Sequence, residues 1–273
     1  TLDAWYLPAN AAGGAATKFS LSGIATLGGY LMAIGTWTLD AGAGPDDYWV
    51  AITSEGEVIV YQGTDPNSIT TWGLVGVWKI GPPIGRRCFM KYQGDLLLVC
   101  IDGVLPLSKA LISARADPTV ALTDNIDGAM STAATLYKNN FGWEIIFLPT
   151  ADMILLNVPE ETGSNQKQFV MNTITGAWAR FTNIAANCWV VFNNEFYFGG
   201  DEFVGKFWEV ASDNGSNIFG DIISAFNYFG ERSTLKRYTM GRPIISANGI
   251  PSVQLGVNVN YNLTAPINNT SFS

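Results

Sequence analysis

Three pairs of adjacent carboxylates are the residues of this sequence that could perform acid–base chemistry. They are Asp46-Asp47, Glu160-Glu161 and Asp201-Glu202, and each pair lies in a polar segment between apolar runs. Enzymes that hydrolyse glycosidic bonds use two carboxyl groups that face each other about 5 to 10 Å apart. Because adjacent residues in a turn seldom face each other, we expect these pairs to be ordinary turn acids and not a catalytic pair.

The other patterns that could bind a metal or activate a nucleophile are incomplete. The chain has no histidine, which removes Ser-His-Asp and Cys-His catalysis and histidine metal sites. Residues 124–128 and 213–215 resemble only part of a calcium-binding loop. Cys88, Cys100 and Cys188 have no C-x-x-C spacing and fall at or within apolar runs, so we expect buried thiols. The sequence therefore predicts no catalytic residue, no metal site, no cofactor and no enzyme.

Arginine and tryptophan side chains offer another chemistry, the recognition of a sugar. Arg86-Arg87 stand at the start of an expected strand, where an ion pair or a rim position is the simpler interpretation. A carbohydrate-binding module needs exposed aromatic platforms on one face. Their candidates are four tryptophans, Trp5, Trp37, Trp49 and Trp143.

The charge of the chain limits its partners. The net charge is −8, and the short basic clusters at residues 86–87 and 232–237 are not the footprint of a nucleic-acid-binding protein. Charged residues make up only 14% of the chain, against about 25% in an average soluble domain. Such a surface fits burial in an assembly. We find no run of 18 apolar residues and expect no membrane-spanning segment.

Four strand pairs must position these residues. They span residues 48–62, 88–101, 143–158 and 188–198, and each consists of an apolar run, a short polar turn and a second apolar run. This pattern is typical of a β-hairpin. The pairs begin roughly 40 to 55 residues apart, a period that indicates the blades of a β-propeller.

Further elements complete the expected units. Strands are expected at residues 72–80, 104–107, 168–172, 177–182 and 203–210, and two short helices at 108–116 and 126–138 form an insertion between the second and third units. Trp72 and Trp178 occupy matching places on an outer strand, where we expect them to pack between neighbouring units.

The expected fold is therefore all-β, and it divides into three parts. Residues 1–19 read as an N-terminal loop, and residues 20–220 as a β-propeller-like domain with the helical insertion at about 108–138. Residues 221–273 read as a smaller β-rich platform segment. Its strands are expected at 222–229, 236–245 and 252–261, before a polar and mobile ending.

Several segments resemble tail proteins of podovirus-like, short-tailed bacteriophages, and the nearest type is the tail nozzle or tail hub. The resemblance covers roughly residues 20–250. The segments that carry it are YLMAIGTWTLDAG (30–42), SEGEVIVYQGTDP (54–66), GRRCFMKYQGDLLLV (85–99), DGVLPLSKAL (102–111), VMNTITGAWARF (170–181), FYFGG (196–200), and ISAFNYFG with KRYTMGRPIIS (223–246).

This resemblance implies a structural protein of the virion, with a β-propeller joined to a β-rich platform. It implies six copies in a ring around the DNA exit channel, beside tail adaptor and fibre or spike proteins. DNA would pass without sequence-specific contact. The alternative is a receptor-recognition propeller that binds carbohydrate or acts as a glycosidase.

Overall fold

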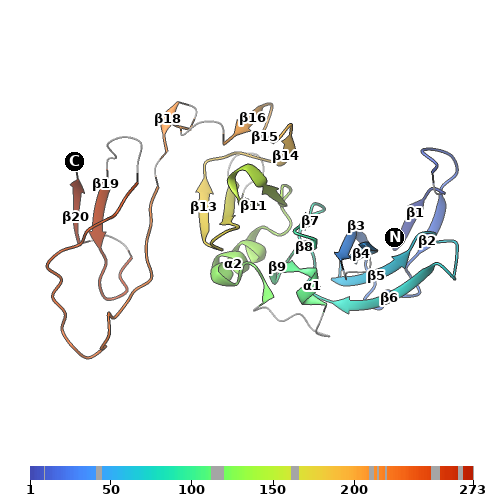
Figure 1. Ribbon diagram of the computed structural model, residues 1–273, viewed down its shortest axis with the longest axis horizontal. Helices are drawn as coiled ribbons and strands as arrows, with labels where there is room; N and C mark the ends of the chain where they lie inside the picture. Colours follow the sequence, from blue (N-terminus) through green and yellow to red (C-terminus); the bar gives the residue numbers. More distant parts are fainter. Residues whose placement is uncertain are drawn as a thin grey trace. The chain divides into compact units, whose positions relative to one another are not determined.

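The chain is built almost entirely of antiparallel strands. The computed structural model describes residues 1–8, 10–40, 45–111, 120–160, 166–208, 212–213, 215–218, 220–246, 253–263 and 267–272. They belong to two compact units, Thr1–Glu209 and Val210–Ser273. Sheets dominate the first unit (Figure 1), and the second unit contains two short strand pairs, so the all-β prediction is confirmed.

Four successive sheets, preceded by one strand pair, make up the first unit. The N-terminal pair is β1 (Asp3–Tyr6) with β2 (Thr17–Ser20). The first sheet is β3 (Leu31–Asp40), β4 (Pro45–Thr53), β5 (Glu57–Gly63) and β6 (Trp72–Lys79), and the second is β7 (Phe89–Tyr92), β8 (Asp95–Cys100) and β9 (Gly103–Pro106). The third sheet is β10 (Glu144–Leu148), β11 (Met153–Pro159), β12 (Gln166–Asn172) and β13 (Trp178–Thr182), and the fourth is β14 (Cys188–Phe192), β15 (Glu195–Gly199) and β16 (Val204–Phe207).

All four predicted strand pairs are antiparallel hairpins: β4–β5, β7–β8, β10–β11 and β14–β15. In the first sheet the pair forms the second and third strands, because β3 precedes it. In the other three sheets it forms the first and second strands. The first predicted repeat is therefore displaced by one strand relative to the other three. The equivalent first strands of the four sheets are β3, β7, β10 and β14.

Neighbouring sheets pack on one another near these first strands. Strand β3 contacts β7 and β8, β7 contacts β10, and β10 contacts β14. One core cluster joins the first three sheets through residues such as Val50, Leu98 and Ile154, and a second joins the third and fourth through Leu155 and Trp189. The described strands form no closed sheet, so the four-sheet series is established and closure into a propeller is not.

The expected N-terminal loop over residues 1–19 is wrong, because β1 and β2 lie there. Strand β5 is buried along most of its length, and its side chains alternate between two cores. Val58 and Val60 face the second sheet, whereas Ile59 and Tyr61 face residues such as Phe19 and Leu21. The N-terminal pair thus covers an apolar sheet face that would otherwise meet water.

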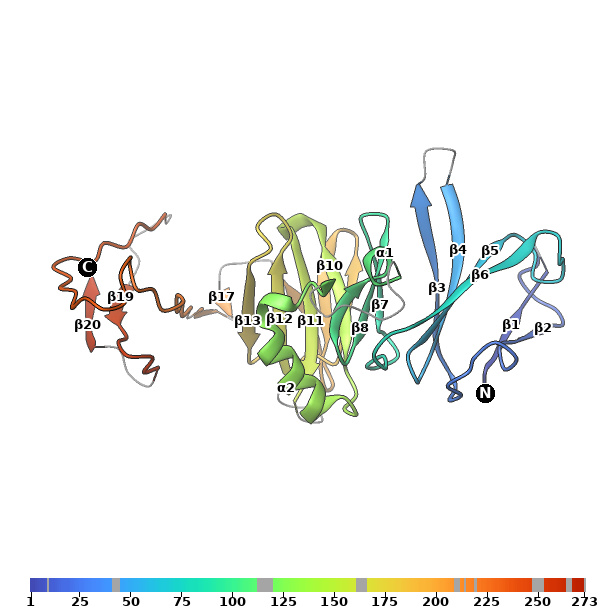
Figure 2. The same cartoon turned by 90° about the horizontal axis from the view of Figure 1, so that it is seen from below.

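Among the described residues, helices occur in the segment between the second and third sheets and in one turn. They are α1 (Leu107–Ala110), η2 (Asp124–Ile126), α2 (Asp127–Tyr137) and η3 (Pro149–Ala151). Helix α2 confirms the prediction for residues 126–138. The prediction for 108–116 overlaps α1, and its residues 112–116 lie outside the described part. Helix α2 buries Met130, Ala133 and Ala134 at helical spacing and packs on β9 and β11 (Figure 2).

The second unit differs from its prediction. It contains β17 (Ser212–Asp213) paired with β18 (Ser216–Asn217), and β19 (Val253–Val257) paired with β20 (Ile267–Phe272). Strand β19 confirms part of the expected strand 252–261. The expected strands 222–229 and 236–245 are wrong, since residues 220–246 contain no helix or strand. The ending expected to be mobile instead supplies β20, because a ladder uses backbone groups whatever the side chains.

Candidate functional site

The carboxylates that could have formed a catalytic pair have other partners or lie apart. Asp47 Oδ1 accepts a hydrogen bond of 2.7 Å from Thr38 Oγ1, and Glu160 forms an ion pair with Lys167. Asp201 and Glu202 are exposed in the turn before β16. The side chain of Asp46 and the whole of Glu161 fall outside the described residues.

The predicted calcium-loop fragments are also used structurally where they are described. Asp124 begins η2 and Asp127 begins α2. The side chain of Asp213 and residue 214 lie outside the described part. Within the ranges that the structure describes, no group of three or more His, Cys, Asp or Glu side chains could hold a metal ion.

Arg87 takes part in a junction of three sheets. Its Nη1 lies 2.7 Å from Oε2 of Glu144 in β10, and that oxygen also accepts a 2.8 Å hydrogen bond from the Trp189 backbone N–H in β14. The guanidinium lies 5.7 Å from the centre of the Phe141 ring. The expected ion pair is confirmed for Arg87, and Glu144 connects the second, third and fourth sheets.

Two of the three thiols are deeply buried. Burial raises the pKa of Cys88 and of Cys100 to about 12, so both remain protonated at neutral pH. Cys188 is half-buried, and all three are free. The prediction of buried thiols is confirmed for Cys88 and Cys100 and is wrong in degree for Cys188.

The tryptophans give little support to a sugar platform. Trp37 and Trp143 are only 7% and 2% exposed, Trp49 is half-buried, and Trp5 alone of the four is well exposed, at 64%. Trp72 and Trp178 each begin the fourth strand of a sheet. Their matching places are confirmed, but the expected packing between repeats is wrong for Trp72, which stacks on Tyr61 of its own sheet and contacts Phe19 of the N-terminal pair.

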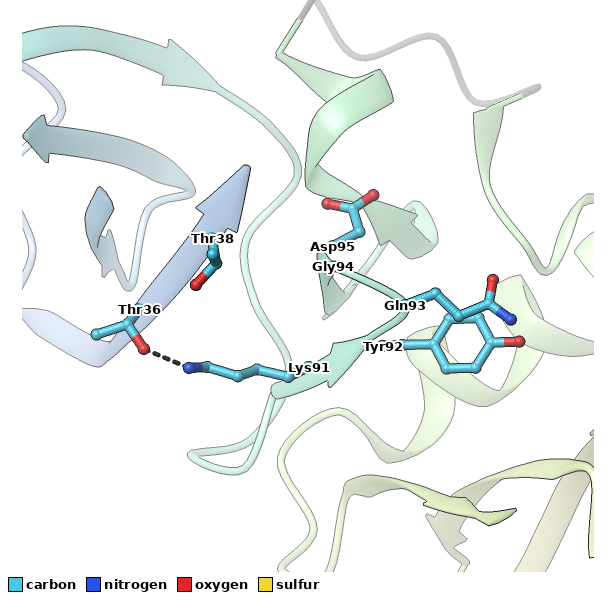
Figure 3. A pocket seen from close by; sticks show the side chains of 7 residues that line it. All are labelled: Thr36, Thr38, Lys91, Tyr92, Gln93, Gly94 and Asp95. Atoms are coloured by element: carbon cyan, nitrogen blue, oxygen red, sulfur yellow. Dashed lines mark hydrogen bonds between the residues drawn. The ribbon is translucent and has the colours of Figure 1, made fainter. Parts of the chain in front are cut away.

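A hollow of about 220 Å³ lies between the first and second sheets (Figure 3). Its walls come from β3 and from the β7–β8 turn. In that turn Gln93 and Gly94 both have positive φ, +50° and +75°, as a tight two-residue hairpin requires. The lining residues are Thr36, Thr38, Lys91, Tyr92, Gln93, Gly94 and Asp95.

Several polar groups of this hollow are engaged with one another or with neighbouring elements. Lys91 Nζ donates to Thr36 Oγ1 across it (Figure 3). Asp95 points toward α1 and accepts hydrogen bonds from the N–H and Oγ of Ser108, at 3.1 and 2.6 Å. The Tyr92 ring packs edge-on against the ring of Phe147 in the third sheet, with 5.1 Å between the ring centres. The hollow is therefore a seam between the first and second sheets.

The outward face of the fourth sheet exposes several large apolar side chains. Val190, Phe192 and Val204 are 53%, 62% and 77% exposed. Strand alternation places them on one face, opposite Trp189 and Phe196, which are buried in the second core cluster. The same register places Tyr197 and the ion pair of Glu195 with Lys206 on this face. We call this surface, whose exposed apolar residues are Val190, Phe192 and Val204, the open face.

Acidic residues lie at one end of the open face. Asp201 and Glu202 form the exposed turn between β15 and β16, and neither has a cationic partner among the residues described. Glu195 is different, because Lys206 Nζ lies 2.7 Å from its Oε1. Exposed apolar side chains beside acidic ones are common at protein–protein interfaces.

Sequence reasoning missed the open face, although a signal for it exists. Residues 188–192 read CWVVF, with no polar residue on either side of the strand. Such a run is typical of a strand covered on both faces. The structure covers only one.

No protein-family model matches the chain, and no curated protein matches it. The described helices include none long and apolar enough to cross a lipid bilayer.

Proposed function

We propose that this chain is a structural protein of the virion of a short-tailed bacteriophage, which forms the nozzle or hub ring of the tail. The resemblance of its segments supports this assignment. The structural observation that supports it is the open face, on the last sheet of the series, where Val190, Phe192 and Val204 are exposed.

The mechanism in this proposal is geometric. The four sheets act as propeller-like blades whose equivalent first strands β3, β7, β10 and β14 lie next to one another in turn. Burying a large apolar side chain contributes about 1.5 to 3 kcal/mol. Covering Val190, Phe192 and Val204 with another subunit or with an adaptor or fibre protein would therefore stabilise an assembly.

The charge of the chain fits a channel wall. At a net charge of −8, carboxylates facing the lumen would repel DNA phosphates and allow the genome to slide without sequence-specific contact. We propose a ring of six copies with head-to-tail contacts, since heterologous interfaces close into rings.

The test is to locate the chain in particles. An antibody against the recombinant chain should label the tail end of purified phage particles in electron microscopy, and the purified chain should form rings in negative stain. Particles that lack the chain in mass spectrometry would refute the proposal.

The carbohydrate alternative has less support. Its platform needs exposed tryptophans, and of the four candidates Trp37 and Trp143 are buried. Its glycosidase form needs a facing pair of acids, and Glu160 is instead engaged by Lys167.

A further inference from the structure

The arm, defined as residues 220–246, is a long segment whose apolar side chains lack cover. It contains no helix or strand, and Ile222, Leu235 and Ile244 are almost completely exposed. Met240 and Phe229 are also largely exposed. Leaving several large apolar side chains in water costs free energy that only a second surface can recover.

Local contacts nevertheless give part of the arm a definite shape. Phe229 and Gly230 have φ of +49° and +104° and form a turn. Lys236 Nζ donates to the backbone carbonyls of Tyr228, Phe229 and Glu231, the last at 2.6 Å. Arg232 lies over the Tyr228 ring at 4.8 Å. A segment shaped in this way loses less conformational entropy when it binds.

The charge of the arm is opposite to that of the rest of the chain. It holds four of the 15 basic residues and two of the 23 acidic ones, a charge of +2 against −10 for the remainder. Lys236 and Arg232 are used in the turn. Arg237 and Arg242 are exposed and have no acidic partner in the described part of the chain.

The open face has the complementary properties. Its exposed apolar residues are Val190, Phe192 and Val204, and Glu195 and Lys206 on the same face form an ion pair with each other. Its rim carries the exposed acids Asp201 and Glu202. We propose that the arm of one copy of this chain docks on the open face of a second copy. The aliphatic side chains of the arm then cover Val190, Phe192 and Val204, and Arg237 and Arg242 meet the acidic rim.

Nucleic acid is the less suitable occupant of the arm. Phosphates would attract Arg237 and Arg242, but they would leave Ile222, Leu235 and Ile244 in water. The acidic rim of the open face would also stay without a partner. The contact between copies is heterologous, so it can propagate around a ring. The ring itself rests on the proposed function, whereas the contact does not.

Charge reversal on the two sides tests this contact in the full chain. Arg237→Glu with Arg242→Glu, and separately Asp201→Lys with Glu202→Lys, should each weaken self-association by about tenfold or more in sedimentation velocity. Mixing the two variants should restore association in a 1:1 ratio, because each arm then meets a face of opposite charge. All four changes in one chain should also restore it. Arg86→Glu with Lys138→Glu is the matched control and should leave association unchanged.

Three outcomes would overturn the inference. If neither pair of charge reversals changes the self-association of the chain, this interface is excluded. If the chain with all four changes regains thermal stability but stays monomeric, the arm binds the open face of its own molecule. If Arg237→Glu with Arg242→Glu abolishes binding to a single-stranded oligonucleotide and leaves self-association unchanged, the arm binds nucleic acid. Failure of the proposed function is separate, since it would show as absence of the chain from particles while the charge variants still control association.

Discussion

Glu57 is the most deeply buried charged side chain among the described residues, at 0% exposure. Its carboxylate accepts hydrogen bonds from the Thr26 N–H at 2.8 Å, the Thr26 hydroxyl at 2.6 Å and the Leu27 N–H at 3.0 Å. Burial alone raises the pKa of Glu57, but the three hydrogen bonds outweigh it, and the pKa is lowered below its ordinary value. The ionised form therefore fastens the segment before β3 to β5.

A lowered pKa makes the contribution of Glu57 dependent on pH. Protonation favours the unfolded chain, so the stabilisation is complete above the ordinary value of about 4.3 and is lost as pH falls through the folded-state pKa. We expect Glu57→Gln to lower the free energy of unfolding at pH 7 by about 1–3 kcal/mol. The difference from the natural chain should shrink in acid, as measured by urea titration at pH 7, 5 and 3.

The exposed neighbour Glu55 supplies the control for this prediction, since Glu55→Gln should change neither quantity appreciably. A Glu57→Gln variant as stable as the natural chain at pH 7 would contradict the assignment.

Side chains of this kind show the limit of sequence reasoning at the residue scale. The ion pair of Arg87 was predictable because a basic pair at a strand start commonly has an acidic neighbour. The roles of Glu57 and Glu144 were not. Their decisive partners, Thr26 and Trp189, lie 31 and 45 residues away and meet them only through the packing of separate elements.

At the scale of elements, two glycines are required for different reasons: one needs space for a neighbouring strand, and the other only needs a positive φ. Gly63, at the end of β5, has φ +138°, and a Cβ there would lie 1.8 Å from the Thr71 carbonyl oxygen. Gly176, in the β12–β13 turn, has φ +69° with open space around it. Both resist substitution by their backbone angle, but only Gly63 lies against another strand.

We therefore expect Gly176→Ala to cost about 1–2 kcal/mol, the penalty of a left-handed backbone. Gly63→Ala should cost clearly more, because β5 and β6 must separate to admit the methyl group. Thermal unfolding of the two variants checks this order. Equal losses would show that the close approach of Thr71 to Gly63 relaxes freely.

The elements divide clearly into those that the sequence predicted and those that it did not. The four hairpins were predictable because apolar runs flank short polar turns and each strand finds its partner a few residues away. The strand at 31–40 was not recognised as the first strand of its sheet, since phase is set by packing between sheets. The strands expected in the arm failed for a related reason: a β-forming sequence makes no strand without a partner.

At the scale of the whole molecule, the buried cores are unevenly distributed. All three core clusters consist of residues of the first unit, from Leu2 to Phe207. The described part of the second unit contributes none, and its arm is exposed along nearly its whole length. The first unit thus contains the interactions that fold it, whereas the second contains side chains suited to association.

Residues 1–209 produced alone should therefore fold. We expect a melting temperature within about 2–4 °C of the full chain, the shift that about 1 kcal/mol causes in a domain of this size. The fragment should also fail to self-associate, because it retains the open face but lacks the arm. Calorimetry and sedimentation velocity measure the two properties independently.

The two results for this fragment have different consequences. An unfolded fragment would mean that residues 210–273 cover part of the cores. The exposed side chains of the arm would then be needed for folding and not for association. A folded fragment that still associates would mean that the open face binds a second open face directly. Only a fragment that is folded and monomeric agrees with an open face that binds the basic arm of another copy.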